Sequence, residues 1–170
     1  SVRSAALAIK ADGVLDLAES AFDNMRVDVD LLQPAAMVPN MRGRDIALKL
    51  LFDGAFGRAR FEYLLTAPGV AFDETGFEQV RAAGKGTLGP SPVTVPIRLS
   101  AARVTGVGDV AGGILRNLSI EGLLRVSAAT ISGDGLKLKS DKLTSTLSIL
   151  VDLATGRYDI GFTGQLQRYL

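Results

Sequence analysis

The chain has 170 residues, enough to bury a core of its own, so the sequence predicts one domain over residues 1–170. Its 19 basic and 18 acidic residues give a net charge of +1, which argues against a nucleic-acid partner, since such proteins concentrate basic side chains on one face. With no cysteine and no histidine, the chain lacks disulfides, thiolate nucleophiles and the commonest general base and transition-metal ligand.

The first third of the chain predicts short strands separated by turns. Residues 1–10 and 14–19 form strand-like runs on either side of an expected turn at Asp12-Gly13. Residues 25–31 alternate apolar and charged side chains, which is typical of a half-buried strand. Pro34 and Pro39 bracket a loop or a single helical turn, and a further strand over residues 46–52 ends at Asp53-Gly54.

The middle of the chain contains one ambiguous segment between two clear strands. Phe61, Tyr63 and Leu65 lie on one face of a strand that we expect to end at Pro68-Gly69. Residues 73–83 fit either a short helix or a strand leading to a turn at residues 84–86. Residues 93–99 alternate again, with Pro96 on the opposite side. Because proline cannot donate to a ladder, this strand lies at an edge or carries a bulge.

The last third ends in the clearest pattern of the chain. Residues 106–117 predict a loop and one short helix, residues 118–126 a strand, and Gly133-Asp134-Gly135 a turn. Residues 142–167 alternate with a period of two on both sides of a turn in which Gly156 can adopt a positive φ. This segment therefore predicts an antiparallel hairpin with one apolar face.

These patterns predict a mainly β fold of ten or eleven strands with one or two short helices. The strands follow one another without helical crossovers, which favours a long antiparallel meander over a parallel sheet. Two interpretations of the apolar faces remain open. In a closed β-sandwich or barrel the faces bury one another, which would give a structural or interaction module without a ligand. In a strongly curved sheet the apolar inner face stays open to acyl chains.

No residue pattern indicates an enzyme or a cofactor site. Gly106-x-Gly108-x-x-Ala111 matches the dinucleotide fingerprint, but no parallel βαβ unit accompanies it and Asp109 would oppose the pyrophosphate. Lys85 lies between two glycines without the spacing of a phosphate-binding loop.

Three aspartates have simple explanations. Asp28 and Asp30 share one strand face, about 7 Å apart, where paired carboxylates can serve a glycosidase or bind calcium. Solvated positions on a polar face explain them better. Asp134, between two glycines, is most simply a turn residue.

Two segments resemble the AsmA-like proteins of bacteria, the TamB and YdbH group. They are residues 93–126, VTVPIRLSAARVTGVGDVAGGILRNLSIEGLLRV, and residues 135–164, with the pattern D-G-L-x-L-x-S-D-x-L ending in L-x-V-D-L-x-T-G-x-Y-x-I. The resemblance is good in the C-terminal half and loose in the N-terminal half. It favours a strand over residues 73–83.

The resemblance implies a function in lipid transport. Such proteins are long periplasmic β-structures, anchored in the inner membrane, whose sheet folds over like a taco shell around an apolar interior proposed to conduct phospholipids to the outer membrane. Members like TamB pair with an Omp85-type outer-membrane barrel. The chain would then be an internal or C-terminal segment that lacks the anchor helix.

Under this interpretation the aliphatic sides of the strands contact the acyl chains, and no side-chain hydrogen bond selects a headgroup. The predicted groove-lining residues are Val93, Val95, Ile97, Leu99, Leu136, Leu138, Leu147, Ile149, Val151, Ile160 and Phe162.

Overall fold

Long antiparallel strands make up most of the protein. The computed structural model describes residues 1–109 and 113–166, and strands account for 72% of the chain. Between the strands lie the single helical turn α1 (Pro34–Met37) and the 3₁₀ turn η1 (Phe56–Arg58). The strands are β1 (Val2–Arg3), β2 (Leu7–Asp16), β3 (Ala21–Leu31), β4 (Met41–Arg44), β5 (Ile46–Ala55), β6 (Arg60–Phe72), β7 (Thr75–Thr87), β8 (Val93–Thr105), β9 (Ile114–Val126), β10 (Thr130–Lys139), β11 (Leu143–Asp152) and β12 (Tyr158–Leu166).

The strands form one sheet in which neighbours in sequence are neighbours in space. Its order is β1-β2-β3-β5-β6-β7-β8-β9-β10-β11-β12, and every pairing is antiparallel. The exception is β4, which pairs with the far half of β6 over Gly69–Phe72, beyond the part of β6 that β5 covers. The predicted antiparallel meander is therefore confirmed, with twelve strands rather than ten or eleven among the described residues.

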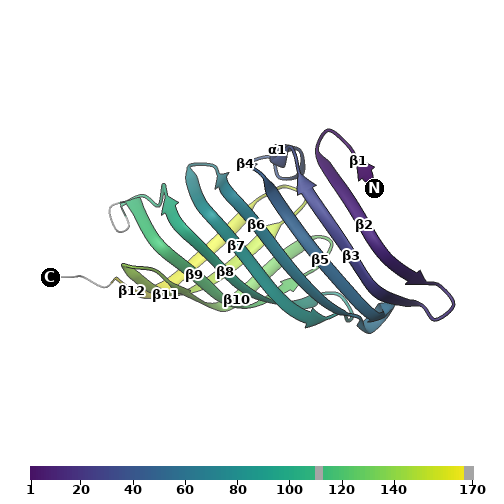
Figure 1. The fold of residues 1–170 in the computed structure, drawn as a ribbon. Helices are drawn as coiled ribbons and strands as arrows, with labels where there is room; N and C mark the ends of the chain where they lie inside the picture. Colours follow the sequence, from purple (N-terminus) through teal and green to yellow (C-terminus); the bar gives the residue numbers. More distant parts are fainter. Residues whose placement is uncertain (110–112, 167–170) are drawn as a thin grey trace.

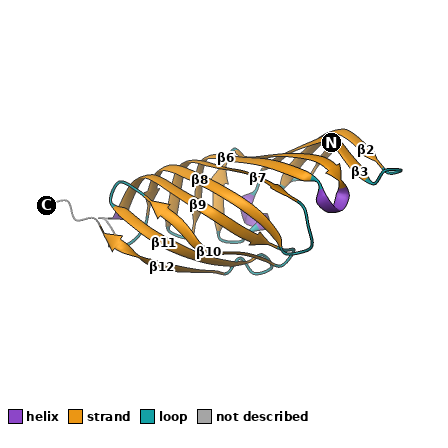
Figure 2. Ribbon diagram, turned by 90° about the horizontal axis from the view of Figure 1, so that it is seen from below, coloured by secondary structure: helices purple, strands orange, loops and turns teal. Residues whose placement is uncertain are grey.

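The sheet curls so that its C-terminal strands lie opposite its central strands. Figures 1 and 2 show β10, β11 and β12 crossing beneath the strands from β5 to β9, while β2 and β3 extend beyond this overlap. The core lies between the two layers and draws side chains from every strand between β5 and β11. Its buried members are Ile46, Ala67, Val80, Ala101, Val104, Leu115, Leu118, Leu136, Leu138 and Leu147.

Register divides the sheet into an apolar inner face and a polar outer face. Residues directly opposite on paired strands point to the same side, so the buried core residues identify the inner face along the whole sheet. On the outer face, three directly opposed pairs form ion pairs. These are Asp53 with Arg60 at 3.0 Å, Glu62 with Lys85 at 3.3 Å, and Arg98 with Glu121 at 3.2 Å. The alternation seen in the sequence is therefore an inside-outside alternation.

The predicted turns at Asp12-Gly13, Asp53-Gly54, Pro68-Gly69, residues 84–86 and residues 133–135 are wrong, because a strand runs through each of them. At Asp12-Gly13 and at residues 133–135 the register shifts, which marks a β-bulge or irregularity within the strand. Gly13 has a φ of 136°, and a Cβ at this position would meet the backbone of Asn24 and Met25 at 2.7 Å. These glycines bend strands instead of ending them.

Other segments agree with the predictions made from the sequence. Residues 75–87 form a strand, and residues 142–167 contain the predicted hairpin as β11 and β12, with Gly156 at a φ of 68° in the turn. The short helix predicted within residues 106–117 falls partly on residues 110–112, outside the described residues. From Ile114 onward this segment belongs to β9.

Pro96 lies on a strand that is central in the sheet but locally unpaired on one side. β8 lies between β7 and β9, yet its pairing with β7 stops at Ala83 and Arg98. The carbonyl oxygen of Pro96 accepts a hydrogen bond from the Tyr63 hydroxyl at 2.7 Å. Because the N and the C=O of a strand residue point to the same side, the missing donor of Pro96 lies on this unpaired side. The strand edge that Pro96 predicts is therefore confined to this unpaired part of β8.

Candidate functional site

The inner face of the N-terminal strands is apolar and uncovered. No residue of β1, β2 or β3 is buried. Opposed residues of β2, β3 and β5 form continuous apolar rows on this face, and each of them is half-buried. We define the open inner face by these residues: Leu7, Ile9, Val27, Val29, Leu48 and Leu50. Apolar surface left uncovered over several adjacent strands is typical of a binding site.

Three phenylalanines close one end of the open inner face. The ring of Phe22 lies 5.4 Å from the ring of Phe52 and 4.7 Å from that of Phe56, measured between centroids. Phe52 is directly opposite the buried Phe61 on the next strand. This aromatic cluster therefore joins the open inner face to the covered interior at that end of the strands.

A second uncovered part of the inner face lies on β12. Tyr158, Ile160 and Phe162 are directly opposite Val151, Ile149 and Leu147 of β11, so they point to the inner side. Leu147 is buried, but Phe162 keeps 61% of its surface exposed and Ile160 keeps 38%. The buried core thus ends at β11, and the inner-face apolar side chains of β12 are exposed to solvent.

All the residues predicted to contact lipid lie on the inner face, but their accessibility differs. Leu136, Leu138 and Leu147 are buried in the core, where they have no surface to offer a ligand. Val93, Val95, Ile97, Leu99, Ile149 and Val151 are half-buried, and Ile160 and Phe162 are exposed. The open inner face on β2, β3 and β5 was not among the predicted positions, although its alternation was recognised.

A polar contact holds the C-terminal hairpin against the first half of the sheet. Asp73, in the turn between β6 and β7, accepts hydrogen bonds at Oδ2 from the Tyr158 hydroxyl at 2.9 Å and from Nδ2 of Asn40 at 3.3 Å. We call Asn40, Asp73 and Tyr158 the clasp. The hydrogen bond to the Asp73 carboxylate, with a smaller contribution from burial, raises the pKa of Tyr158.

The turn of the hairpin packs beside the clasp. Gly156 is buried, and a Cβ at its position would lie 3.3 Å from Pro39 and 3.5 Å from Val38. Together with the clasp, these segments border an open depression of about 410 Å³. The clasp and the packed turn together hold the hairpin against this side of the sheet.

Aromatic side chains of β6 cover glycines of β7 beyond the point where β7 stops pairing with β8. Tyr63 lies directly opposite Gly84, and Phe61 lies opposite Gly86. A Cβ at Gly84 would collide with the carbonyl oxygen of Pro96 and with the Tyr63 ring. Glycine is therefore required here so that the tyrosine can reach across β7 to Pro96, and burial raises the pKa of this tyrosine.

The polar positions considered in the sequence lie on the outer face or in connections. Register places Asp28 between Lys10 and Lys49, so the Asp28–Asp30 pair belongs to the charged outer face. Lys85 of β7 forms an ion pair with Glu62 of β6. Gly106 and Gly108 follow the antiparallel strand β8 in a connection, with φ values of 74° and 65°, and Ala111 is outside the described residues.

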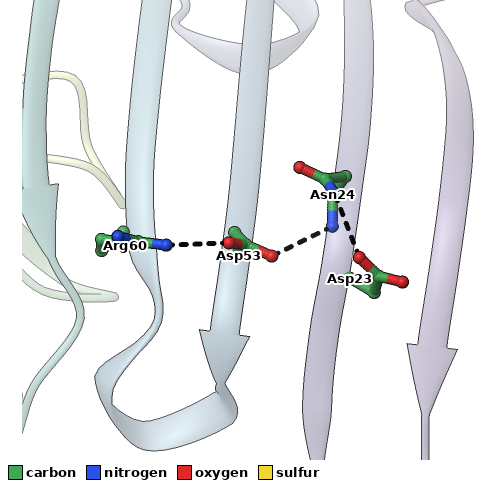
Figure 3. Close-up of polar contacts among 4 residues, drawn as sticks. All are labelled: Asp23, Asn24, Asp53 and Arg60. Atoms are coloured by element: carbon green, nitrogen blue, oxygen red, sulfur yellow. Dashed lines mark hydrogen bonds and ion pairs between the residues drawn. The ribbon is translucent and has the colours of Figure 1, made fainter.

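Asp53 belongs to a polar group on the outer face (Figure 3). Its Oδ1 accepts a hydrogen bond from the backbone N–H of Asn24 at 3.3 Å, and its Oδ2 accepts one from Arg60 at 3.0 Å. The Asn24 hydrogen bond first, and then the Arg60 guanidinium, lower the pKa of Asp53. The group ties β3, β5 and β6 together on the side away from the apolar face.

These observations define a mainly β protein with one open antiparallel sheet, apolar on its inner face. Within the described residues, no group of acidic side chains could hold a metal ion, and no helix is long and apolar enough to cross a membrane. No protein-family model, curated protein or solved structure matches this chain at a significant level.

The sequence did not indicate the clasp. Asp73 and Tyr158 are 85 positions apart. In the sequence, Asp73 has the character of an ordinary turn residue and Tyr158 that of an ordinary strand residue. Their meeting depends on the accumulated curl of all the strands between them, which no local pattern specifies.

Proposed function

We propose that this chain is a non-enzymatic segment of a periplasmic bridge protein that carries phospholipid acyl chains between the inner and outer membranes, and so supports outer-membrane biogenesis. The observation that carries the proposal is the open inner face, on which six half-buried aliphatic side chains from β2, β3 and β5 lie side by side. Each Å² of this surface that an acyl chain covers contributes about 25 cal/mol.

The inner face also fits a ligand without a specific headgroup. Residues opposed across the described strands place the charged side chains on the outer face, as for Lys10, Asp28 and Lys49. An acyl chain needs apolar contact alone, whereas a polar ligand would need hydrogen-bonding partners on the face that it covers.

The resemblance of residues 93–126 and 135–164 to AsmA-like proteins supports the cellular setting of the proposal. It favours a location in the periplasm, an inner-membrane anchor supplied by the full-length protein, and an Omp85-type barrel as the partner of other parts of that protein. The fold agrees with the folded-over sheet that this resemblance implies.

Native mass spectrometry with lipid extraction tests the proposal. We expect the chain purified from a bacterial host to carry phospholipid, and we expect Leu48→Arg to abolish this, since it places a charge in the middle of the open inner face. Ala47→Arg is the matched control. It adds the same side chain at the neighbouring position of β5, on the outer face opposite Asp30, where it should leave bound lipid unchanged.

The two variants separate loss of binding from loss of folding. Both should keep the far-ultraviolet circular dichroism spectrum of the parent chain, because neither position belongs to the buried core. A folded parent chain that carries no lipid and refuses a fluorescent fatty acid would refute the proposal.

A structural module without a ligand is the second candidate, and the covered half of the inner face favours it. Leu136 is 2% exposed and Leu147 is 5% exposed, so the C-terminal strands bury their apolar side chains against the chain itself. If this arrangement extended to the whole inner face in solution, Leu48→Arg would unfold the protein instead of releasing lipid.

A further inference from the structure

The outer face has one position at which like charges are directly opposed. Register places Arg103 of β8 opposite Arg116 of β9. At the other paired positions of the described strands, directly opposed charges have opposite signs, and three such pairs form ion pairs. Because directly opposed like charges destabilise a sheet, this arginine pair costs stability wherever its charges are not neutralised.

No side chain of the described residues neutralises the arginine pair. Neither guanidinium forms an ion pair with a described carboxylate. Glu78 is directly opposite Arg103 on the other side of β8 without pairing with it. Asp141 accepts the backbone N–H of Arg116 at 2.9 Å and forms no ion pair with its guanidinium. Residues 110–112, outside the described part of the chain, are Val-Ala-Gly and carry no charged side chain.

The guanidinium of Arg103 is also partly removed from water. The residue is half-buried, and its Nε is shielded from solvent without a hydrogen-bond partner among the described residues. A shielded donor that has lost its water and gained no acceptor is unfavourable, and more so on a charged group. Arg103 therefore combines an unmet hydrogen bond with an unmet charge.

Two further arginines increase the positive charge around the pair. Arg44 of β4 lies in the same row of the register, which runs through Gly69 of β6 and Glu78 of β7 to Arg103. Arg81 of β7 lies between two buried inner-face residues, so it points outward. These arginines are scattered in the sequence, and the pairing of the strands brings them to one part of the outer face.

The geometry of two opposed guanidinium groups selects the kind of anion that fits them. Each guanidinium presents a planar fork of N–H donors that binds two oxygens of one anion. A carboxylate or a phosphate diester offers two free oxygens and a single charge, which one fork satisfies. A phosphate monoester has three terminal oxygens and close to two negative charges at neutral pH, which suits both forks together.

We infer that Arg103 and Arg116 bind the phosphate group of a phosphate monoester on the outer face of the sheet. The Cα atoms of directly opposed residues lie about 5 Å apart, so both side chains reach one anion held between them. The bound phosphate replaces the repulsion between the guanidinium groups with attraction and supplies the acceptor that Arg103 lacks. This phosphate site lies on the opposite face from the open inner face and does not depend on acyl-chain binding.

Isothermal titration calorimetry with inorganic phosphate, at constant ionic strength, tests the phosphate site. We expect one phosphate to bind per chain, and Arg103→Gln or Arg116→Gln to weaken binding about tenfold or more, because each removes a charge-assisted pair of hydrogen bonds. Arg125→Gln is the matched control. Arg125 is an exposed arginine of the same strand β9, but it is opposite Thr94 and Ser132. A parent chain that does not bind phosphate, or equal weakening in the control, would overturn the inference.

Thermal unfolding at low ionic strength separates this role from a structural one. In chloride without phosphate, Arg116→Gln should raise the melting temperature, since it removes one of two opposed like charges. Phosphate should raise the melting temperature of the parent chain and leave that of the variant nearly unchanged, whereas acetate should change neither. If the variant melts below the parent chain in chloride, the arginine pair is not repulsive and the inference is wrong.

Vesicle flotation distinguishes a lipid headgroup from a soluble source of the same phosphate group. Phosphatidic acid carries a phosphate monoester and phosphatidylglycerol a diester, and the two vesicle preparations are adjusted to equal surface charge. Retention on phosphatidic acid alone, lost in Arg103→Gln, would assign the site to a lipid headgroup. Phosphate binding in solution without retention on either vesicle would assign it to a soluble monoester. Equal retention on both vesicles, unchanged in Arg103→Gln, would contradict recognition of a monoester.

Discussion

The N-terminal strands and the C-terminal strands have the same alternation of apolar and polar residues, but only one group forms a core. Val27, Val29 and Leu31 alternate on β3 as regularly as Leu136 and Leu138 do on β10. Yet β1–β3 have no buried residue, whereas Leu136 is 2% exposed. The pattern therefore identifies which face is apolar, and the curl of the sheet decides whether anything covers it.

The strands also differ in the size of the side chains on their inner face. β7 presents small inner residues, Ala82, Gly84 and Gly86, and aromatic rings from β6 lie across the two glycines. β3 and β5 present Val27, Leu50 and similar large side chains, which crowd the concave side of a bent sheet.

The largest expected contrast between the two regions comes from truncating one leucine in each. Leu136→Ala should lower the free energy of unfolding by about 3 kcal/mol, because it leaves a cavity in a packed core. Leu48→Ala, on the open inner face, should cost about 1 kcal/mol, since its side chain is already half in water. Urea unfolding of both variants measures the difference, and equal losses would mean that the two regions are covered alike.

Adding a methyl group at Gly84 tests whether small inner residues are needed where β7 no longer pairs with β8. We expect Gly84→Ala to destabilise the fold by about 1–3 kcal/mol, because the new Cβ meets Pro96 and Tyr63. Gly69→Ala is the control, since a Cβ there has no neighbour within 4 Å and its φ is not positive. Thermal unfolding of both variants decides the matter. If Gly84→Ala is as stable as Gly69→Ala, the close approach is not a constraint.

Removing one hydroxyl should loosen the covering of the interior without unfolding it. Tyr158→Phe loses the hydrogen bond to Asp73, worth at most about 1 kcal/mol, and should speed hydrogen exchange in β11 and β12 more than in β2 and β3. The pH dependence follows from the raised pKa of Tyr158. The clasp is fully formed below the ordinary tyrosine value of 10.0 and is lost as the pH rises through the higher folded value. Exchange that is unchanged in the variant would contradict the clasp.

The smallest expected effect concerns the outer face, which the two regions share. Arg60→Gln should raise the pKa of Asp53 toward 3.8 but leave it below that value, because the Asn24 N–H makes the larger contribution. Any stability that the lowered pKa provides is present above pH 3.8 and disappears as the pH falls through the folded value. Carboxyl titration by nuclear magnetic resonance measures the shift, and an unchanged pKa would show that Arg60 does not contribute.

Most of the fold could be predicted from the sequence, and the errors share one cause. Alternation identified the apolar side of nearly every strand, and the hairpin of β11 and β12 was recognised with its turn. Glycine beside aspartate, proline or lysine predicts a turn at Gly13, Gly69 and Gly84, where the structure has a continuous strand. A turn and a bulge need the same backbone freedom, so composition alone does not separate them.

The candidate site was harder to predict than the fold. The sequence identified Ile160 and Phe162 as inner-face residues, and they are exposed as a binding surface requires. It placed Leu136 and Leu147 in the same group, although the curl of the sheet buries both. Which rows are covered depends on contacts between strands far apart in the chain, and no window of sequence contains that information.

The clasp also bears on the order in which the protein folds. Strands that are neighbours in sequence pair with each other, so the sheet can grow from any hairpin without closing long loops. In a flexible chain, joining Asp73 to Tyr158 across 85 positions would cost about 4 kcal/mol of loop-closure entropy, several times what their hydrogen bond returns. The clasp therefore forms last, when the rigid curl of the assembled strands has already brought its two sides together.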